Sequence, residues 1–376
     1  MEERYDLKKI YIYILLLFII SIFIFWAYQR NSFWIDKEIF WQDAIKKSPK
    51  KIRPYINLGA AYLEKKEYKK AEYYLSKALR LIQTGQRIPE KPYSSLYNNL
   101  GESYLYLGKL KKAKQMFLIA IKKNPKSYIA YYNLGILYKK TKRYNKAIDS
   151  FKKAAEFNPF EPKIYNNLGI AYALSGDNLN AKNSFEKAIM LKPNYLKAYY
   201  NLGNVYRDMG KIDEGIKMYE KALTINPDYP NGLKNIAILY IKKRDWNKAL
   251  DYLKRYLSHH GDDAAIWELV GNLSFLLGKY DDAIDELKKA MMLGRKGYIL
   301  YNNLGAAYLE VGKLDEAEKF LKMALSSNPN AAKTLENLAD IYVKRGEKEK
   351  AANFYKRALK IDPNNERMQR KLNRLK

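Results

Sequence analysis

The sequence contains no cysteine and only two histidines, His259 and His260, in 376 residues. The missing thiols exclude disulfides, thiolate metal sites, a lipoprotein anchor and cysteine catalysis. The two histidines precede Asp262 and Asp263. Adjacent side chains rarely converge on one ion, and no third group of ligands accompanies them. We therefore interpret this stretch as a polar turn and expect neither a metal nor a cofactor.

Motifs of catalysis are also missing. The stretch "GNLSFLLGK" has six residues between its glycines, more than a phosphate-binding loop has. The sequence shows no serine-nucleophile turn and no alternating pattern of a strand. Its carboxylates fall on exposed helix faces, where pairing with lysines one turn away explains them. We expect that the chain is not an enzyme.

Acidic residues are scarce in the first third of the chain. The net charge is +29 at pH 7, and residues 28–150 carry 27 Lys/Arg against 9 Asp/Glu, whereas residues 251–350 carry 15 against 16. Lysine-rich, solvated helix faces explain this excess, and so does attraction to an anionic lipid surface or polymer. Nucleic acid is disfavoured as a partner because the lysines form no recognisable nucleic-acid-binding module.

One uncharged run stands out near the N-terminus. Residues 10–29, "IYIYILLLFIISIFIFWAYQ", follow a short tail of residues 1–9. As a helix the run is long enough for a bilayer core of about 30 Å. Bulky residues follow it where a cleavage site needs small ones. The run predicts an uncleaved single-pass membrane anchor in contact with lipid, with the N-terminus inside and the bulk of the chain outside the cytoplasm.

A repeat fills most of the remaining chain. The small residue that follows "NL" recurs at intervals of 34, apart from a first interval of 42. This period predicts nine units within residues 52–365. The eight extra residues of the first interval fall in the stretch "QTGQRIPEKPYSS", which predicts an extended loop between the first two units. The units start at 52, 94, 128, 162, 196, 230, 264, 298 and 332.

Each unit has the pattern of two amphipathic helices. In the fourth unit Leu168, Gly169 and Tyr172 share one helix face, Phe185 lies on the next helix, and Pro193 ends it. The pattern resembles the tetratricopeptide repeat. That resemblance implies an all-α fold, a right-handed superhelix of helix pairs, and an inner groove lined by the first helix of each pair.

The ends and one internal region depart from the repeat. Residues 31–49 resemble the second helix of a half-repeat, and residues 366–376 form an amphipathic helix suited to capping the last unit. Tyr256 replaces the usual alanine in the sixth unit, and Ser274 replaces the usual tyrosine in the seventh. We expect weaker packing and a bend around residues 256–298.

On the resemblance, the groove is where a partner binds. Amides satisfy peptide backbone groups whatever the side chains are, and tyrosines add rigid contact area. The predicted partner-binding residues are Asn98, Asn99, Glu102, Tyr132, Asn133, Lys139, Asn166, Asn167, Tyr200, Asn201, Asn204, Arg207 and Asn235. An asparagine recurs in eight of the nine units, at Asn57, Asn99, Asn133, Asn167, Asn201, Asn235, Asn303 and Asn337.

This asparagine series has two interpretations. It is similar to the peptide-binding ladder in the superhelix of O-linked N-acetylglucosamine transferase, and asparagine is also common at this position in ordinary tetratricopeptide repeats. The junction of the uncharged run and the first repeat is similar to membrane O-mannosyltransferase-like proteins that carry these repeats. The catalytic parts of both families are missing. Binding of chaperone tails is disfavoured, because Ile238 and Leu269 replace residues of the clamp that Lys234 would begin.

The leading interpretation is a membrane-anchored scaffold that binds peptide segments or protein partners in its groove at the membrane surface. One alternative is a non-catalytic accessory subunit or remnant of a membrane glycosyltransferase system. Another is binding of an anionic polymer or lipid surface by the basic first repeats.

Overall fold

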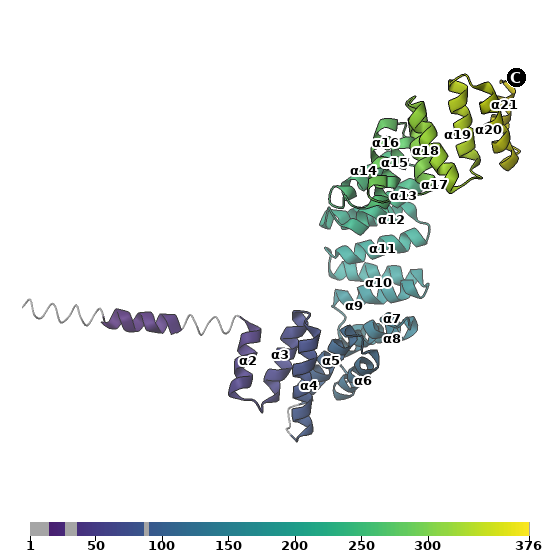
Figure 1. The fold of residues 1–376 in the computed structure, drawn as a ribbon. Coiled ribbons are helices and arrows are strands. Elements are labelled where there is room, and N and C mark those ends of the chain that lie inside the picture. The colour runs from purple at the N-terminus through teal and green to yellow at the C-terminus, as the bar shows by residue number, and fades with distance from the viewer. Residues whose placement is uncertain (1–14, 27–35, 86–89, 376) are drawn as a thin grey trace, which may run out of the picture. The chain divides into compact units, whose positions relative to one another are not determined.

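The computed structural model describes residues 15–26, 36–85 and 90–375, and in these ranges the chain forms helices and turns without any strand (Figure 1). The chain divides into two compact units, Met1–Pro193 and Asn194–Lys376. The first unit holds α2 (Lys37–Lys47), α3 (Ile52–Glu64), α4 (Tyr68–Gln83), α5 (Glu90–Tyr106), α6 (Leu110–Lys123), α7 (Tyr128–Lys140), α8 (Tyr144–Phe157), α9 (Pro162–Leu174) and α10 (Asn178–Leu191).

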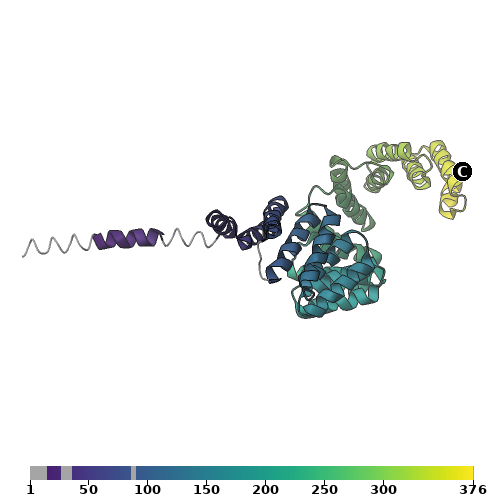
Figure 2. The ribbon, with the colours of Figure 1, turned by 90° about the horizontal axis from the view of Figure 1, so that it is seen from below.

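The second unit is built in the same way and ends in a single short helix, which lies beside α20 (Figure 2). Its helices are α11 (Leu196–Asp208), α12 (Ile212–Ile225), α13 (Pro230–Lys242), α14 (Trp246–Leu257), α15 (Ala264–Leu276), α16 (Tyr280–Met292), α17 (Tyr298–Glu310), α18 (Leu314–Ser327), α19 (Ala332–Lys344), α20 (Lys348–Ile361) and α21 (Glu366–Asn373).

Consecutive helices pack as pairs, from α3 with α4 to α19 with α20, and each pair packs on the next within its unit. The glycine of the first helix sets how closely a pair can approach. A Cβ at Gly135 would lie 2.6 Å from the ring of Phe151, which is fully buried. Gly169 stands in the same relation to Phe185. The all-helical solenoid of helix pairs that the repeat pattern predicts is therefore confirmed.

The predicted single-pass membrane protein is wrong on the evidence of the structure. Within the described part of the uncharged run, residues 15–26 are helical. Among the residues that the structure describes, no helix is both long and apolar enough to cross a membrane. Residues 10–14 and 27–29, the rest of the run, lie outside the described residues.

The segment before the first pair is shorter than expected. Its helix α2 runs from Lys37 to Lys47, against the expected 31–49, of which residues 31–35 lie outside the described ranges. This helix packs on α3, where the hydroxyl of Tyr62 donates to Glu38 at 2.8 Å. The Lys65 ammonium lies 2.5 Å from the same carboxylate. Polar contacts thus hold the half-repeat on the first full pair.

The expected loop before the second pair is partly helical. Helix α5 begins at Glu90, four residues before the predicted unit start at 94. Its first turn contains Pro92, which a helix tolerates there because the first backbone amides have no partner within the helix. Residues 86–89 of the loop lie outside the described ranges.

The irregular sixth and seventh units contain buried polar side chains at the positions that depart from the repeat. Tyr256 is buried, its ring stacks on His260 at 4.5 Å, and its hydroxyl donates to Asp263 at 2.9 Å. Ser274, also buried, donates to the buried carboxylate of Glu286 at 2.5 Å. Polar side chains therefore replace the missing repeat residues rather than leaving space. In the described ranges, no three His, Asp or Glu side chains come together to hold a metal ion.

Candidate functional site

In the first unit, the predicted groove residues of α5 and α7 bond to one another across the repeat boundary. The Asn133 amide donates to the side-chain oxygen of Asn98 at 3.1 Å, and both residues are buried. Asn98 in turn donates to Asn99 at 3.4 Å. Asn166 on α9, at the position equivalent to Asn98, is buried as well. These amides are placed between repeats, where hydrogen bonds offset the cost of burial.

Asn167 on α9 is tied to α7 by several hydrogen bonds. Its amide nitrogen donates to the Tyr132 hydroxyl at 2.9 Å and to the backbone oxygen of Lys163 at 3.0 Å. Its amide oxygen accepts from the Lys139 ammonium at 2.6 Å. Both N–H donors of this amide are thus engaged within the protein.

Glu102 and Lys139 are the two charged groups among the predicted groove residues of the first unit. Burial raises the pKa of the Glu102 carboxyl and lowers the pKa of the Lys139 ammonium. Within the described ranges neither group forms an ion pair. Each is therefore a partly desolvated group whose charged form is disfavoured where it stands.

The second unit shows the same bonding between α11 and α13. The Asn235 amide donates to Asn204 at 2.9 Å and to the Tyr200 hydroxyl at 3.1 Å. Tyr219, from the second helix α12, donates to the same Asn204 oxygen at 2.7 Å. Burial raises the pKa of Tyr219 to about 12, so its hydroxyl remains a donor at neutral pH.

The remaining two predicted residues of α11 are Arg207 and Asn201. Arg207 is half-buried and pairs with the neighbouring Asp208 at 3.0 Å. Asn201 is half-buried and has a partner of its own. The structure thus brings the predicted residues together within each unit, and it engages many of them with one another.

The cross-repeat bonds that the recurring asparagines donate follow two spacings. Asn133, Asn167 and Asn235 each reach a residue 35 positions earlier, and Asn235 and Asn303 each reach a residue 31 positions earlier. In every case the donor is the recurring asparagine. Since the amide donors point to the preceding repeat, the geometry favours a role of this residue in fixing how successive repeats meet.

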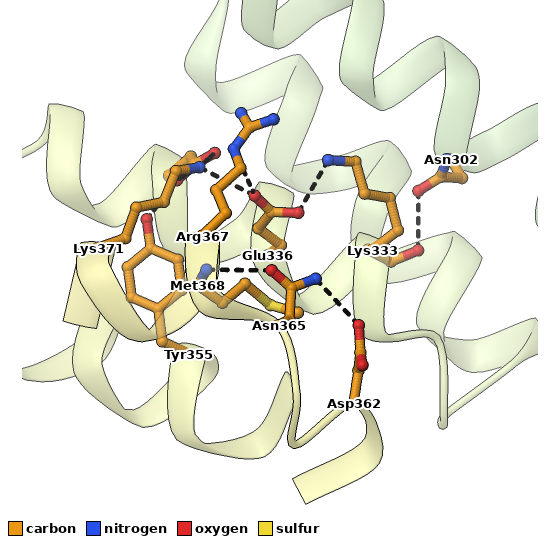
Figure 3. A network of polar contacts seen from close by, with 11 residues as sticks. Asn302, Lys333, Glu336, Tyr355, Asp362, Asn365, Arg367, Met368 and Lys371 are labelled. Atoms are coloured by element: carbon orange, nitrogen blue, oxygen red, sulfur yellow. Dashed lines mark hydrogen bonds and ion pairs between the residues drawn. The ribbon is translucent and has the colours of Figure 1, made fainter. Parts of the chain in front are cut away.

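At the C-terminus a lysine takes the place of the recurring asparagine (Figure 3). The Lys371 ammonium lies 3.0 Å from Glu336, 35 positions earlier, and 2.6 Å from Asp340, 31 positions earlier. Helix α21 therefore bonds to α19 as the first helix of a further repeat would. Glu336 is buried, and Lys333 and Arg367 lie 2.8 and 3.6 Å from its carboxylate.

The pKa of Glu336 reflects this network. Burial by itself raises the pKa of its carboxyl, but the hydrogen bonds from Lys333 and Lys371 outweigh burial and lower it. Below the network, Met368 is buried, and the side chain of Asn365 accepts from its backbone amide at 3.2 Å (Figure 3). The sequence indicated the apolar face of this helix but not the buried carboxylate that receives Lys371.

The first helices also carry exposed aliphatic side chains that the sequence analysis did not single out. In the first unit these are Ile129 on α7, 45% exposed, and Leu174 on α9, 50% exposed. In the second unit they are Ile238, Leu276, Ile299 and Val343, on α13, α15, α17 and α19. The sequence carried one signal for them. Each is an apolar residue at a position of the first helix that does not contribute to packing between helices.

Comparison with known proteins supports the repeat assignment. Residues 50–122 and 128–160 match models of the tetratricopeptide repeat. No curated protein sequence matches the chain. Nothing in these comparisons supports the expected likeness to the two transferase families or a membrane anchor, and no catalytic family is matched.

Several solved structures resemble part of the chain. They include pilF of Pseudomonas aeruginosa (22% identity, 56% of this chain and 96% of that one, TM-score 0.49) and MamA (28%, 44% and 97%, 0.42). YrrB, a TPR protein with an unusual peptide-binding site, is 24% identical over 51% of this chain and 95% of its own, with a TM-score of 0.41.

A further model matches residues 170–376, more than half of the chain, and is described as the cilia and flagella-associated protein 70 C-terminal domain. Together with the repeat models and the helix pairs, this match shows that the chain belongs to that family of tetratricopeptide-repeat proteins.

Proposed function

We propose that this scaffold binds extended polypeptide segments along the first helices of its pairs, separately in each unit. The observation that carries the proposal is the series of exposed aliphatic side chains on those helices, from Ile129 to Val343. Single exposed apolar residues are common on protein surfaces and need no functional explanation. A series that recurs on equivalent helices is different, because it suits an extended ligand whose side chains contact the surface at intervals along its length.

The charged groups of the first unit add to this surface. The Lys139 ammonium has three N–H donors and donates one hydrogen bond to Asn167. A peptide carbonyl that accepts from Lys139 would restore part of the solvation that burial removes. Glu102, whose pKa burial raises, would accept from a peptide N–H or pair with a basic side chain in the same way.

The recurring asparagines have a supporting part in this proposal. Because Asn133, Asn167 and Asn235 donate to the preceding repeat, their replacement by alanine would weaken the fold as well as any binding. The exposed aliphatic residues are better test positions, since replacing them removes no internal contact of comparable size.

The test compares first-helix and second-helix positions of equal exposure in the full-length chain. Peptides are selected from a random display library on the wild-type protein, and their affinities are measured by fluorescence polarisation. We expect Ile129→Ser with Leu174→Ser to weaken the selected peptides about 10-fold, through the loss of buried apolar area. Leu118→Ser with Leu179→Ser, at exposed positions of α6 and α10, is the matched control. Equal losses in both variants would refute binding along the first helices.

A further inference from the structure

A row of cations lies along one edge of the first unit, where the first helix of each pair turns into the second. We name it the turn ridge. All its members are exposed, and within the described residues none of them pairs with a carboxylate. The members are Lys66 between α3 and α4, Lys69 in the first turn of α4, Lys111 and Lys112 at the start of α6, Lys140 at the end of α7, Lys142 and Arg143 between α7 and α8, and Lys146 in the first turn of α8.

Carboxylates lie near Lys66 and Lys69, at Glu64 and Glu67, but the rest of the ridge has none in its stretch of sequence. Residues 103–148 contain 12 Lys/Arg and no Asp or Glu. In the second unit, the corresponding second helices carry carboxylates in their first turns, such as Asp213, Asp281 and Asp315. Helices α4, α6 and α8 carry none there. Lys69, Lys111, Lys112 and Lys146 lie in the first turns of these helices, where a cation opposes the helix dipole and lowers the stability of the helix.

The backbone conformation at two of the same turns also lowers stability. Lys66 and Lys142 have φ angles of 61° and 57°, in the left-handed region. The turns that follow α5, α9 and α11 place Gly108, Gly176 and Gly210 in that region instead. Glycine adopts it without the clash that a side chain brings. Arg244 in the second unit has the same conformation, with a φ angle of 60°, so it provides a matched position at which strain and ridge charge can be separated.

We propose that the turn ridge binds an acidic segment of a partner protein. The ridge offers seven lysines and one arginine, point charges that suit carboxylates spread along an extended chain. Tyr68 and Tyr106, at the same edge, stack on each other with ring centroids 4.5 Å apart. One face of each ring is covered by the other ring, and this disfavours the base stacking that single-stranded nucleic acid requires. The ridge is separate from the proposed first-helix surface, so the two proposals stand or fall independently.

The first test measures affinity in the full-length chain. A fluorescein-labelled oligoglutamate peptide is titrated by fluorescence anisotropy at several salt concentrations. We expect Lys111→Gln, Lys112→Gln, Lys142→Gln and Arg143→Gln together to weaken binding about 10-fold, and added salt to weaken it further. The control removes the same charge from exposed, unpaired positions of the second unit, and it should change affinity less than about 2-fold. Its substitutions are Lys217→Gln, Lys221→Gln, Lys242→Gln and Arg244→Gln.

Unchanged affinity in the ridge variant, or an equal loss in the control, would overturn the ridge as the binding surface. Tighter binding of a single-stranded oligonucleotide of equal charge, or of vesicles with anionic lipid, would overturn the assignment to a protein segment. Tighter binding of the peptide supports it.

The second test uses stability and affinity together. Lys142→Gly should raise the melting temperature by about 1–3 °C because it relieves the left-handed turn, and it should weaken the peptide about 2-fold. Arg244, with a φ angle of 60°, is the matched position in the second unit. Arg244→Gly should give the same stabilisation without loss of affinity. A stabilised Lys142→Gly variant that binds as tightly as the wild type would show that the charge of Lys142 has no part in binding.

Discussion

Replacing Lys371 with methionine should release the C-terminal helix α21 from the last repeat. The ammonium lies 3.0 Å from the buried carboxylate of Glu336 and 2.6 Å from that of Asp340 (Figure 3). Removing one partner of a fully buried ion pair costs about 3–5 kcal/mol. Here Glu336 keeps Lys333 and the Lys371 side chain is 23% exposed, so we expect a cost of about 1–3 kcal/mol. Methionine keeps the apolar part of the side chain, which restricts the change to the charge.

Hydrogen exchange of the full-length chain is the appropriate assay, because the loss is local. Amides of α21 should exchange about 10- to 100-fold faster in the variant, while those of α11 and α12 should not change. Arg370→Met is the matched control on the same helix, since Arg370 pairs only with exposed Glu366 at 3.7 Å. Equal exchange of α21 in the wild type and in Lys371→Met would refute the reasoning.

The same network makes a prediction about acid. Because the folded-state pKa of Glu336 lies below its ordinary value of 4.5, its stabilising contribution is fully present above pH 4.5 and decreases as the pH falls below it. Exchange of α21 should therefore accelerate below about pH 4.5 in the wild type. In Glu336→Gln, which titrates no proton there, it should accelerate less.

Two further predictions concern packing within a helix pair and a buried carboxylate. Gly135→Ala should lower the free energy of unfolding by about 1–3 kcal/mol in urea, because its Cβ would lie 2.6 Å from the Phe151 ring. Gly261→Ala should change it little, because its Cβ would make only an ordinary contact, 3.7 Å from the Leu257 backbone oxygen. The pKa of Glu318 is lowered to about 2: burial raises it, but hydrogen bonds from Lys322, Tyr342 and Arg345 outweigh burial. Its contribution, about 1–2 kcal/mol, should be lost as the pH falls from 4.5 towards 2, and urea unfolding of Glu318→Gln over that range should lack this component.

Much of the fold could be predicted from local patterns. The spacing of Gly135 and Phe151, 16 residues apart, recurs in neighbouring units and predicts helix pairs that approach closely. The partial exception is residues 10–29, whose composition predicted a membrane span. Composition indicates which residues favour an apolar environment, but a span also needs an unbroken helix of sufficient length. Among the residues that the structure describes, no helix is long and apolar enough for a span.

The candidate site could be predicted only in part. The sequence placed Asn133 and Asn167 on the first helices, but the partners of their amides lie 35 residues earlier, and no local pattern identifies them. The choice between the two interpretations of the asparagine series depends on those partners. Ile129 and Leu174 were missed because a single aliphatic residue on a helix has the same local signature whether a neighbouring helix covers it or not.

The sequence by itself determined the period of 34 residues, the pairing of helices and the basic charge of the first third, because each depends on residues close together in the chain. Tertiary structure alone decided which side chains meet across repeats. Lys371 shows the difference: its charge is visible in the sequence, but its role follows from packing α21 on α19, which brings it to Glu336 and Asp340. The same holds for the turn ridge, whose lysines form one edge only because successive helix pairs stack. Contacts across repeats depend on how the pairs pack, and helical periodicity does not specify that packing.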